Sequence, residues 1–183
     1  SEEYEGAGEM VSLLAKFFRT SLSQGKDMIP LEKELEHATS YLAIQNIRFK
    51  DKFEFKVKAD PALLKYLCPK LSIQPLLENA IYHGLPSDLS RQGLIRIEAW
   101  REDDKLNIVI EDNGEGMTKE QIEAVFSTPA GDRKRFNGIG ISNVNARIRL
   151  FFGEDFGIRY ESSPGNYTKA VLLLPAVDGA GEE

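Results

Sequence analysis

The sequence of residues 74–84 is Gln-Pro-Leu-Leu-Glu-Asn-Ala-Ile-Tyr-His-Gly. Its apolar residues recur at helical spacing, which predicts a helix over residues 71–84. On such a helix Asn79 and His83 lie four residues apart, on one stripe at the edge of the apolar face. There an amide oxygen could bind a metal ion and an imidazole could meet a phosphate. A capping pair, or a polar pair at the edge of the core, would explain the same spacing.

A second polar cluster follows the apolar run of residues 106–110, which predicts a strand. Residues 112–117 read Asp-Asn-Gly-Glu-Gly-Met. A carboxylate at the end of a strand, here Asp112, can accept a hydrogen bond from an exocyclic amine. Gly114 and Gly116, just before Met117, would let the backbone approach a flat ring closely. An ordinary Asx-Gly turn is the alternative interpretation.

A glycine-containing segment, Asn-Gly-Ile-Gly-Ile-Ser-Asn at residues 137–143, precedes a helix predicted over residues 142–152. Unpaired backbone amides near Gly138, Ile139 and Gly140 could form an anion site that the helix dipole favours. The segment is not the dinucleotide fingerprint, because no strand precedes it and the third glycine is missing. A flexible turn capped by Ser142 would look the same.

Two further features lie near these clusters. Thr168 opens a predicted strand, where its hydroxyl could contact a ligand or could be purely structural. Residues 127–135 have no periodicity and are predicted to form a mobile loop. Arg133, Lys134 and Arg135 within it could contact phosphates, although a solvated charge cluster is the simpler interpretation.

The remaining pattern predicts an α+β fold, a two-layer α/β sandwich in which helices cover one face of a mixed sheet, preceded by an N-terminal helical hairpin. The helices of the hairpin are expected over residues 7–23 and 31–49, and a short helix over 119–126. Strands are expected over residues 53–58, 94–100, 106–111, 157–162 and 168–174. The predicted division is a helical region at 1–50, a second domain at 51–178 and a disordered tail at 179–183.

Composition excludes several classes of protein. The net charge of −6 and the pI near 5.1 give no basic surface for nucleic acid. The single cysteine, Cys68, lies in an apolar run and is expected to be a packed thiol. No stretch is long and apolar enough for a transmembrane helix, so any membrane contact is expected through a region N-terminal to residue 1.

Taken together and in this order, the clusters resemble the N, G1 and G2 boxes of the ATPase fold shared by histidine kinases, type II topoisomerases, mismatch-repair ATPases and heat-shock chaperones, the GHKL or Bergerat fold. Residues 31–36 (Leu-Glu-Lys-Glu-Leu-Glu) and 41–49 (Tyr-Leu-Ala-Ile-Gln-Asn-Ile-Arg-Phe) extend the likeness to sensor histidine kinases of the LytS/YesM type.

This resemblance implies ATP and Mg²⁺ as ligands. It implies that Asn79 binds Mg²⁺, that His83 lies near the phosphates and that Asp112 recognises adenine. It further implies that Gly114 and Gly116 shape the base pocket and that Gly138 and Gly140 form the hinge of a lid. The other residues that the resemblance assigns to the nucleotide are Met117, Ile139, Asn143 and Thr168, and Arg147 also matches a family position.

The sequence departs from the family pattern at four places. Tyr82 stands where the family usually has a basic residue before the N-box histidine. Pro75 stands where hydrolysing relatives have a glutamate base, which disfavours an intrinsic ATPase, and Glu78 is a weaker candidate for the base. Tyr167 replaces the usual glycine before Thr168. His37 lacks the context of a phosphoacceptor and is interpreted as a surface residue, so the acceptor is expected before residue 1.

The expected function is therefore the ATP-binding catalytic domain of a two-component sensor histidine kinase, which transfers the γ-phosphoryl group to an upstream histidine. The full-length protein is expected to be a homodimer with a response regulator as partner, and this domain to be the cytoplasmic part of an inner-membrane sensor. The alternative is a non-catalytic, nucleotide-regulated binding or dimerisation module of the same superfamily.

Overall fold

A five-stranded mixed sheet forms the centre of the molecule in the computed structural model, with strand order β2-β4-β5-β7-β6. The model describes all residues except 1, 22–25, 51, 87–90, 128–137 and 180–183. The strands are β2 (Phe53–Ala59), β4 (Gly93–Glu102), β5 (Lys105–Asp112), β6 (Gly157–Ser163) and β7 (Tyr167–Pro175). Only β2 and β4 pair in parallel, and the other neighbours are antiparallel.

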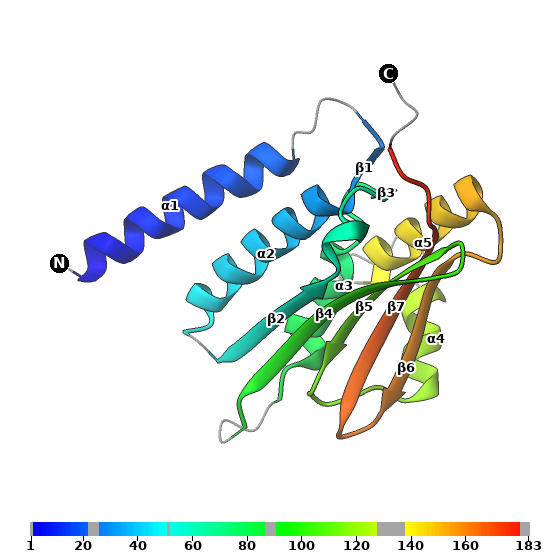
Figure 1. The fold of residues 1–183 in the computed structure, drawn as a ribbon. Coiled ribbons are helices and arrows are strands. Elements are labelled where there is room, and N and C mark those ends of the chain that lie inside the picture. Colours follow the sequence, from blue (N-terminus) through cyan, green and yellow to red (C-terminus); the bar gives the residue numbers. More distant parts are fainter. Residues whose placement is uncertain (1, 22–25, 51, 87–90, 128–137, 180–183) are drawn as a thin grey trace.

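Helices cover one face of this sheet (Figure 1). They are α2 (Leu31–Arg48), α3 (Gln74–Asn79), α4 (Lys119–Ser127) and α5 (Gly138–Phe152), with short turns η1 (Pro61–Leu63) and η2 (Ala80–Gly84). The first helix, α1 (Glu2–Ser21), packs on α2 and lies away from the sheet. The predicted fold class, a two-layer sandwich with a mixed sheet, is confirmed. Within the described part of the chain, no helix has the length and apolar content that crossing a membrane requires.

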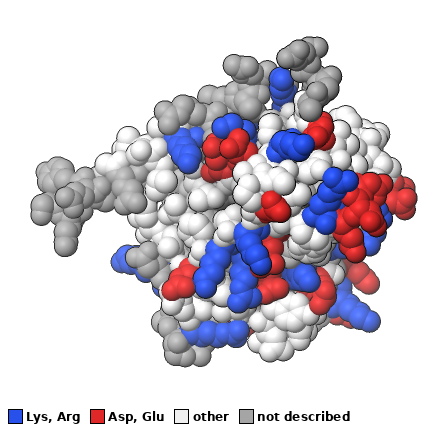
Figure 2. Space-filling view, in the orientation of Figure 1, with Lys and Arg blue, Asp and Glu red and all other residues white. Residues whose placement is uncertain are grey.

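Alternation along the strands explains why only one face is covered. In β4, Ile95, Ile97 and Ala99 are buried, whereas Arg96 and Glu98 between them are exposed. Successive side chains of a strand point to opposite faces, so one face of β4 is apolar and the other is exposed to solvent. Figure 2 shows the outward face with lysine, arginine and acidic side chains interspersed.

The helical hairpin is packed onto the rest of the molecule. Leu31 and Leu42 of α2 are fully buried and belong to the same hydrophobic core as Phe53 and the central strands. The interpretation of His37 as a surface residue is wrong, since only 2% of it is exposed. Its ring stacks on Phe17 of α1 with centroids 4.4 Å apart. The polar side of α2 is thus covered by α1, which the pattern of α2 alone does not reveal.

A small second sheet went unpredicted. β1 (Met28–Pro30) pairs antiparallel with β3 (Leu67–Pro69). Cys68 is fully buried there, and its thiol donates a hydrogen bond to the carbonyl oxygen of Ile29 at 3.6 Å. The prediction of a packed thiol is confirmed.

Two predicted helices begin elsewhere. The helix expected from residue 71 begins at Gln74, because Leu71 adopts φ 57°, and it ends in the π-helical turn η2. The helix expected from residue 142 begins at Gly138. Residues 128–135 of the predicted loop and 180–183 of the predicted tail lie outside the described residues, whereas the amide of Gly179 donates a hydrogen bond to the carbonyl oxygen of Lys65 at 3.4 Å.

Candidate functional site

Asp112 lies at the end of the central strand β5 and is buried, with 2% of its surface exposed. Its Oδ1 accepts a hydrogen bond from the amide of Gly114 at 3.1 Å, and the amide of Thr168 also donates to the carboxylate. Burial disfavours the charged form and raises the pKa of Asp112 to about 6, although both amides oppose this shift. A buried carboxylate whose pKa is raised toward 7 is typical of a functional site.

Glycines bring the backbone against this carboxylate. A Cβ on Gly84 would overlap the carboxylate of Asp112, and a Cβ on Gly114 would overlap the carbonyl oxygen of Gly84. The end of the helical segment 74–84 and the end of β5 are thus in direct backbone contact. Position 114 requires glycine, as predicted, because any side chain there would overlap the backbone of Gly84. Gly84 itself was not among the predicted site residues.

The neighbouring turn completes this end of the sheet. Gly116 has φ 66°, a left-handed conformation that favours glycine, and a Cβ on it would overlap the carbonyl oxygen of Ser163. The amide of Met117 donates to Ser162 Oγ at 2.7 Å, and that hydroxyl lies 3.2 Å from Thr168 Oγ1. Asp112, Gly114, Gly116, Met117 and Thr168 are therefore gathered at one place.

Tyr160 of β6 contributes an unpaired polar atom near this place. Its hydroxyl is buried and has no hydrogen-bond partner among the described residues. Burial raises the pKa of Tyr160, and the charge of Asp112 raises it further. Its ring meets Phe126 of α4 edge to face, with centroids 6.0 Å apart. A buried hydroxyl without a partner is costly, so a water or a ligand atom is expected to satisfy it.

Asn79 and His83, the polar pair predicted on the helix over residues 71–84, differ in exposure. Asn79 is buried at the end of α3, whereas His83 is exposed on the π-helical turn. Such turns occur frequently at functional sites. Glu78 Oε1 accepts a hydrogen bond from Gln74 Nε2 at 2.9 Å. The charge of Glu78 also contributes to the raised pKa of Tyr41, after burial as the main cause, so Glu78 faces α2.

The glycine-containing segment is part of a helix and does not precede one. Gly138, Ile139 and Gly140 form the first turn of α5, so the helix begins four residues before the predicted start at residue 142, and the alternative of a flexible turn capped by Ser142 is excluded. A Cβ on Gly140 would lie 3.3 Å from Cβ of Pro75, so close packing of α5 on α3 explains this glycine. Asn143 is exposed on α5. The segment with Arg133, Lys134 and Arg135 lies outside the described residues.

Comparison with known families agrees with this geometry. Residues 70–178 match the model of the family described as histidine kinase-, DNA gyrase B-, and HSP90-like ATPase. The chain belongs to this ATPase family. Residues 1–53 match a second model, described as histidine kinase. Both matches confirm the resemblance on which the predicted fold rested.

Curated relatives of this ATPase domain are sensor kinases. The sensor histidine kinase BtsS of Escherichia coli is 34% identical over 176 residues, which cover 96% of this chain and 29% of the relative. The sensor histidine kinase YesM of Bacillus subtilis is 35% identical over 167 residues, covering 91% and 27%. The sensor protein LytS of Oceanobacillus iheyensis is 32% identical over 161 residues, covering 87% and 27%. The chain spans less than a third of the length of these relatives.

Solved structures share the fold. The catalytic domain of the histidine kinase ThkA superimposes with a TM-score of 0.60 at 18% identity, covering 81% of this chain and 94% of that domain. The histidine kinase domain of a blue-light activated kinase from Erythrobacter litoralis gives 0.57 at 15% identity, covering 94% and 81%. These likenesses establish the architecture of the ATPase domain.

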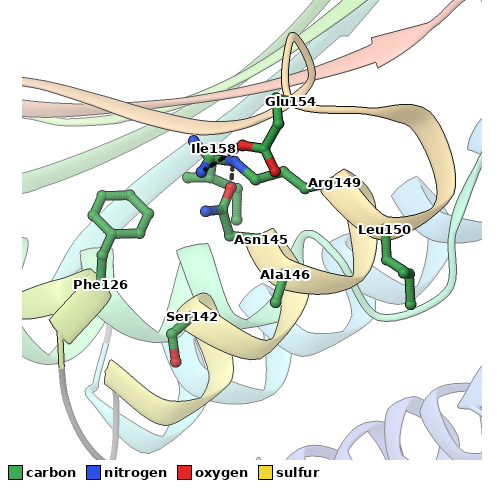
Figure 3. Close-up of a pocket in the computed structure, with 8 residues that line it drawn as sticks. All are labelled: Phe126, Ser142, Asn145, Ala146, Arg149, Leu150, Glu154 and Ile158. Atoms are coloured by element: carbon green, nitrogen blue, oxygen red, sulfur yellow. Dashed lines mark hydrogen bonds and ion pairs between the residues drawn. The ribbon is translucent and has the colours of Figure 1, made fainter.

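A hollow of about 750 Å³ lies elsewhere on the ATPase domain, between α4, α5 and β6. Figure 3 shows the Arg149–Glu154 ion pair and the hydrogen bond from the amide of Ile158 to Asn145 Oδ1 within it. Its lining contains none of the predicted site residues. The lining residues are Phe126, Ser142, Asn145, Ala146, Arg149, Leu150, Glu154 and Ile158.

Sequence reasoning missed three residues at the Asp112 site: Gly84, Ser162 and Tyr160. Gly84 ends the quoted stretch 74–84 and could have been selected by its place after His83. Ser162 and Tyr160 carry no such signal, because only the pairing of β6 with β7 brings them near β5.

Proposed function

We propose that this ATPase domain binds ATP with its adenine at Asp112 and is the catalytic part of a sensor histidine kinase. The observation that carries the proposal is the buried carboxylate of Asp112 against the backbone of Gly84 and Gly114. The carboxylate can accept a hydrogen bond from the exocyclic amine of adenine. Gly84 and Gly114 let the helical segment and β5 pack closely, and this packing fixes the position of the carboxylate.

The surroundings of Asp112 fit a purine. The buried Tyr160 hydroxyl needs a partner, and the hydroxyls of Ser162 and Thr168 lie 3.2 Å apart near the same strand ends. Met117, with 9% of its surface exposed, offers an apolar wall. A mostly apolar pocket with a few convergent polar groups is the usual form of a cofactor or substrate site.

The phosphates and Mg²⁺ would lie toward Asn79 and the start of α5. No group of three or more His, Cys, Asp or Glu that could hold a metal occurs in the part of the chain that the structure describes. Mg²⁺ commonly takes one or two protein oxygens and completes its shell with substrate phosphates and waters. We assign the Asn79 amide oxygen to this role and place His83 near the phosphates. The amides around Gly138, Ile139 and Gly140 at the first turn of α5 would favour negative charge.

In the proposed reaction the γ-phosphoryl group leaves ATP and forms a bond to an imidazole nitrogen, while ADP departs. Such transfer depends on positioning and on electrostatic stabilisation of the phosphates. The chain has two histidines, and we assign neither as the acceptor: His37 is buried against Phe17 and His83 belongs to the nucleotide site. Pro75 cannot activate water, so we expect little hydrolysis in the absence of an acceptor.

In the full-length protein we expect a homodimer that passes the phosphoryl group on to a response regulator. The named sensor kinases to which the chain is similar support this placement. We also place the domain in the cytoplasm, as part of an inner-membrane sensor.

Phosphotransfer to an acceptor separates this proposal from a non-catalytic, nucleotide-regulated module. The domain is mixed with the isolated acceptor-helix region of a LytS/YesM-type kinase and ATP labelled at the γ-phosphate. Acid-labile label on the acceptor's histidine, absent when that histidine is replaced by glutamine, is the expected result. Tight ATP binding without any transfer would favour the regulatory module, and absence of ATP binding would refute both.

A further inference from the structure

A carboxylate from α2 holds the start of α3. Glu34 lies in the first turn of α2 with 1% of its surface exposed. Its Oε2 accepts a hydrogen bond from the amide of Leu71 at 3.1 Å, and its Oε1 accepts from the amide of Ile73 at 3.0 Å. The hydroxyl of Ser72 also lies 3.4 Å from Oε1. Three successive residues immediately before α3 are thus fixed by one side chain from another helix.

The start of α3 needs such a partner. The first amides of a helix have no acceptor within the helix, and the residue before Gln74 provides no side-chain cap. Leu71 adopts φ 57°, a conformation that a leucine keeps only when its surroundings impose it. Glu34 accepts from the amide of the N-cap residue Ile73 and from the amide of Leu71, so it holds the residues that lead into α3.

Two further hydrogen bonds hold Lys70, the residue before Leu71. Arg147 Nη2 of α5 donates to the carbonyl oxygen of Lys70 at 2.6 Å. The amide of Lys70 donates to the carbonyl oxygen of Asp27 at 2.9 Å. We name residues 70–73 the α3 junction, since α2, α5 and the segment before β1 meet there.

The position of α3 determines the nucleotide site at its other end. Asn79 is the last residue of α3, and Gly84 follows one π-helical turn later, directly beneath the Asp112 carboxylate. Gly84 and Gly114 are packed so closely that a shift of α3 along its axis would separate Gly84 from Asp112 or force it into Gly114. The junction therefore sets the geometry between Asn79, Gly84 and Asp112.

We propose that Glu34 is a positioning residue for the nucleotide site: it fixes the α3 junction, and through it the placement of Asn79 and Gly84, from the helix next to α1. This inference rests on the proposed function for its effect on ATP, but its structural part, the hold of Glu34 on α3, can be tested without nucleotide.

The test compares Glu34→Gln with Glu32→Gln, an exposed glutamate in the same first turn of α2. Glutamine keeps the size of Glu34 but offers one acceptor oxygen, so one of the amides of Leu71 and Ile73 loses its partner. Without nucleotide, hydrogen exchange at these two amides and along residues 74–84 is expected to become faster in Glu34→Gln and to remain unchanged in Glu32→Gln.

Calorimetric titration with a non-hydrolysable ATP analogue and Mg²⁺, well below the unfolding temperature of each protein, then measures the consequence. We expect the affinity of Glu34→Gln to fall about tenfold, a typical size for coupling between sites. Equilibrium unfolding in urea reports the folded fraction of each protein separately. Unchanged affinity in a folded variant whose junction exchanges faster would overturn the proposal, as would faster exchange spread evenly over the whole chain.

Two further outcomes are distinguishable. If Glu34→Gln does not fold, Glu34→Asp keeps two acceptor oxygens on a side chain one methylene shorter and is expected to speed exchange at Leu71 and Ile73 and to lower affinity about threefold; a folded Glu34→Asp with neither change overturns the role of Glu34. If the unaltered chain binds no nucleotide, the proposed function fails, and the exchange comparison alone decides whether Glu34 holds α3.

Discussion

Among the described residues two carboxylates are buried, Glu34 and Asp112, and they have different roles. Burial raises the pKa of both. Glu34 accepts from two amides and a hydroxyl in a junction where helices meet. Asp112 accepts from the amides of Gly114 and Thr168 and lies against the backbone of Gly84, and its charge raises the pKa of the nearby Tyr160.

The difference between them lies in what surrounds the carboxylate more than in its burial. Donors from one loop surround Glu34, so its role is to hold that loop. Asp112 lies instead against glycine backbone at position 84, at the end of β5 where Gly114, Gly116, Met117 and Thr168 also gather. A buried acid is therefore better classified by its neighbours than by its pKa, which is raised in both cases.

The strongest test of this contrast is Asp112→Asn. Loss of a charged acceptor for the adenine amine is expected to weaken binding of an ATP analogue about 100-fold, measured by calorimetry with Mg²⁺. Glu111→Gln is the control, because Glu111 pairs with Arg96 at 2.8 Å on the outward face of the sheet. Unaltered affinity in Asp112→Asn would make Asp112 a structural acid like Glu34.

The pH dependence of stability provides the next largest effect. Burial raises the pKa of Asp112 from 3.8 to about 6, so its neutral form is favoured in the folded state. The contribution of Asp112 to the free energy of unfolding is fully present below pH 3.8 and is lost as the pH rises through 6. Relative to Asp112→Asn, the wild-type free energy of unfolding should fall by about 2 kcal/mol between pH 4 and pH 7 in urea titrations. Parallel curves for the two proteins would contradict the raised pKa.

Gly84→Ala tests whether bare backbone is required beside Asp112. The added methyl group would meet the carboxylate and displace it, so we expect about a tenfold loss of affinity for the ATP analogue. Gly8→Ala is the matched control, because a Cβ on Gly8 in α1 has no neighbour within 4 Å. Equal affinities of the two variants would mean that the site tolerates a side chain there.

Arg147→Lys is expected to give the smallest effect and probes the other side of the α3 junction. Lysine retains the charge but cannot reproduce the guanidinium donor that reaches the carbonyl oxygen of Lys70. We expect a loss of about 0.5 to 1 kcal/mol in the free energy of unfolding by urea. Unchanged stability would show that this hydrogen bond does not hold the junction.

Local pattern was sufficient for much of the fold. The alternation in β2 and β4 and the helical spacing in α1 and α2 depend on neighbours along the chain, and these elements were predicted within a few residues. The strands β1 and β3 were missed because three residues each carry too little pattern, and their pairing is a tertiary event.

The errors have a shared physical cause. Glycines at 138 and 140 suggested a loop, yet packing of Gly140 on Pro75 favours a helix there. The apolar spacing predicts a helix that includes Leu71. Its observed conformation is not helical, because Glu34, 37 positions earlier in the chain, holds its amide. Asp112 and the adjacent glycines could be selected from sequence, whereas Tyr160 and Ser162 reach the site through strand pairing.

The stacking of Phe17 on His37 gives the chain a built-in spectroscopic reporter. Burial, and secondarily the charge of Lys70, lowers the pKa of His37 below 6.5. Because the chain contains only two histidines, the imidazole resonances of His37 can be identified by a single substitution at His83. Detachment of α1 would return the titration of His37 toward its ordinary range, so proton NMR across pH can follow how firmly the first helix stays docked while the nucleotide site is empty or filled.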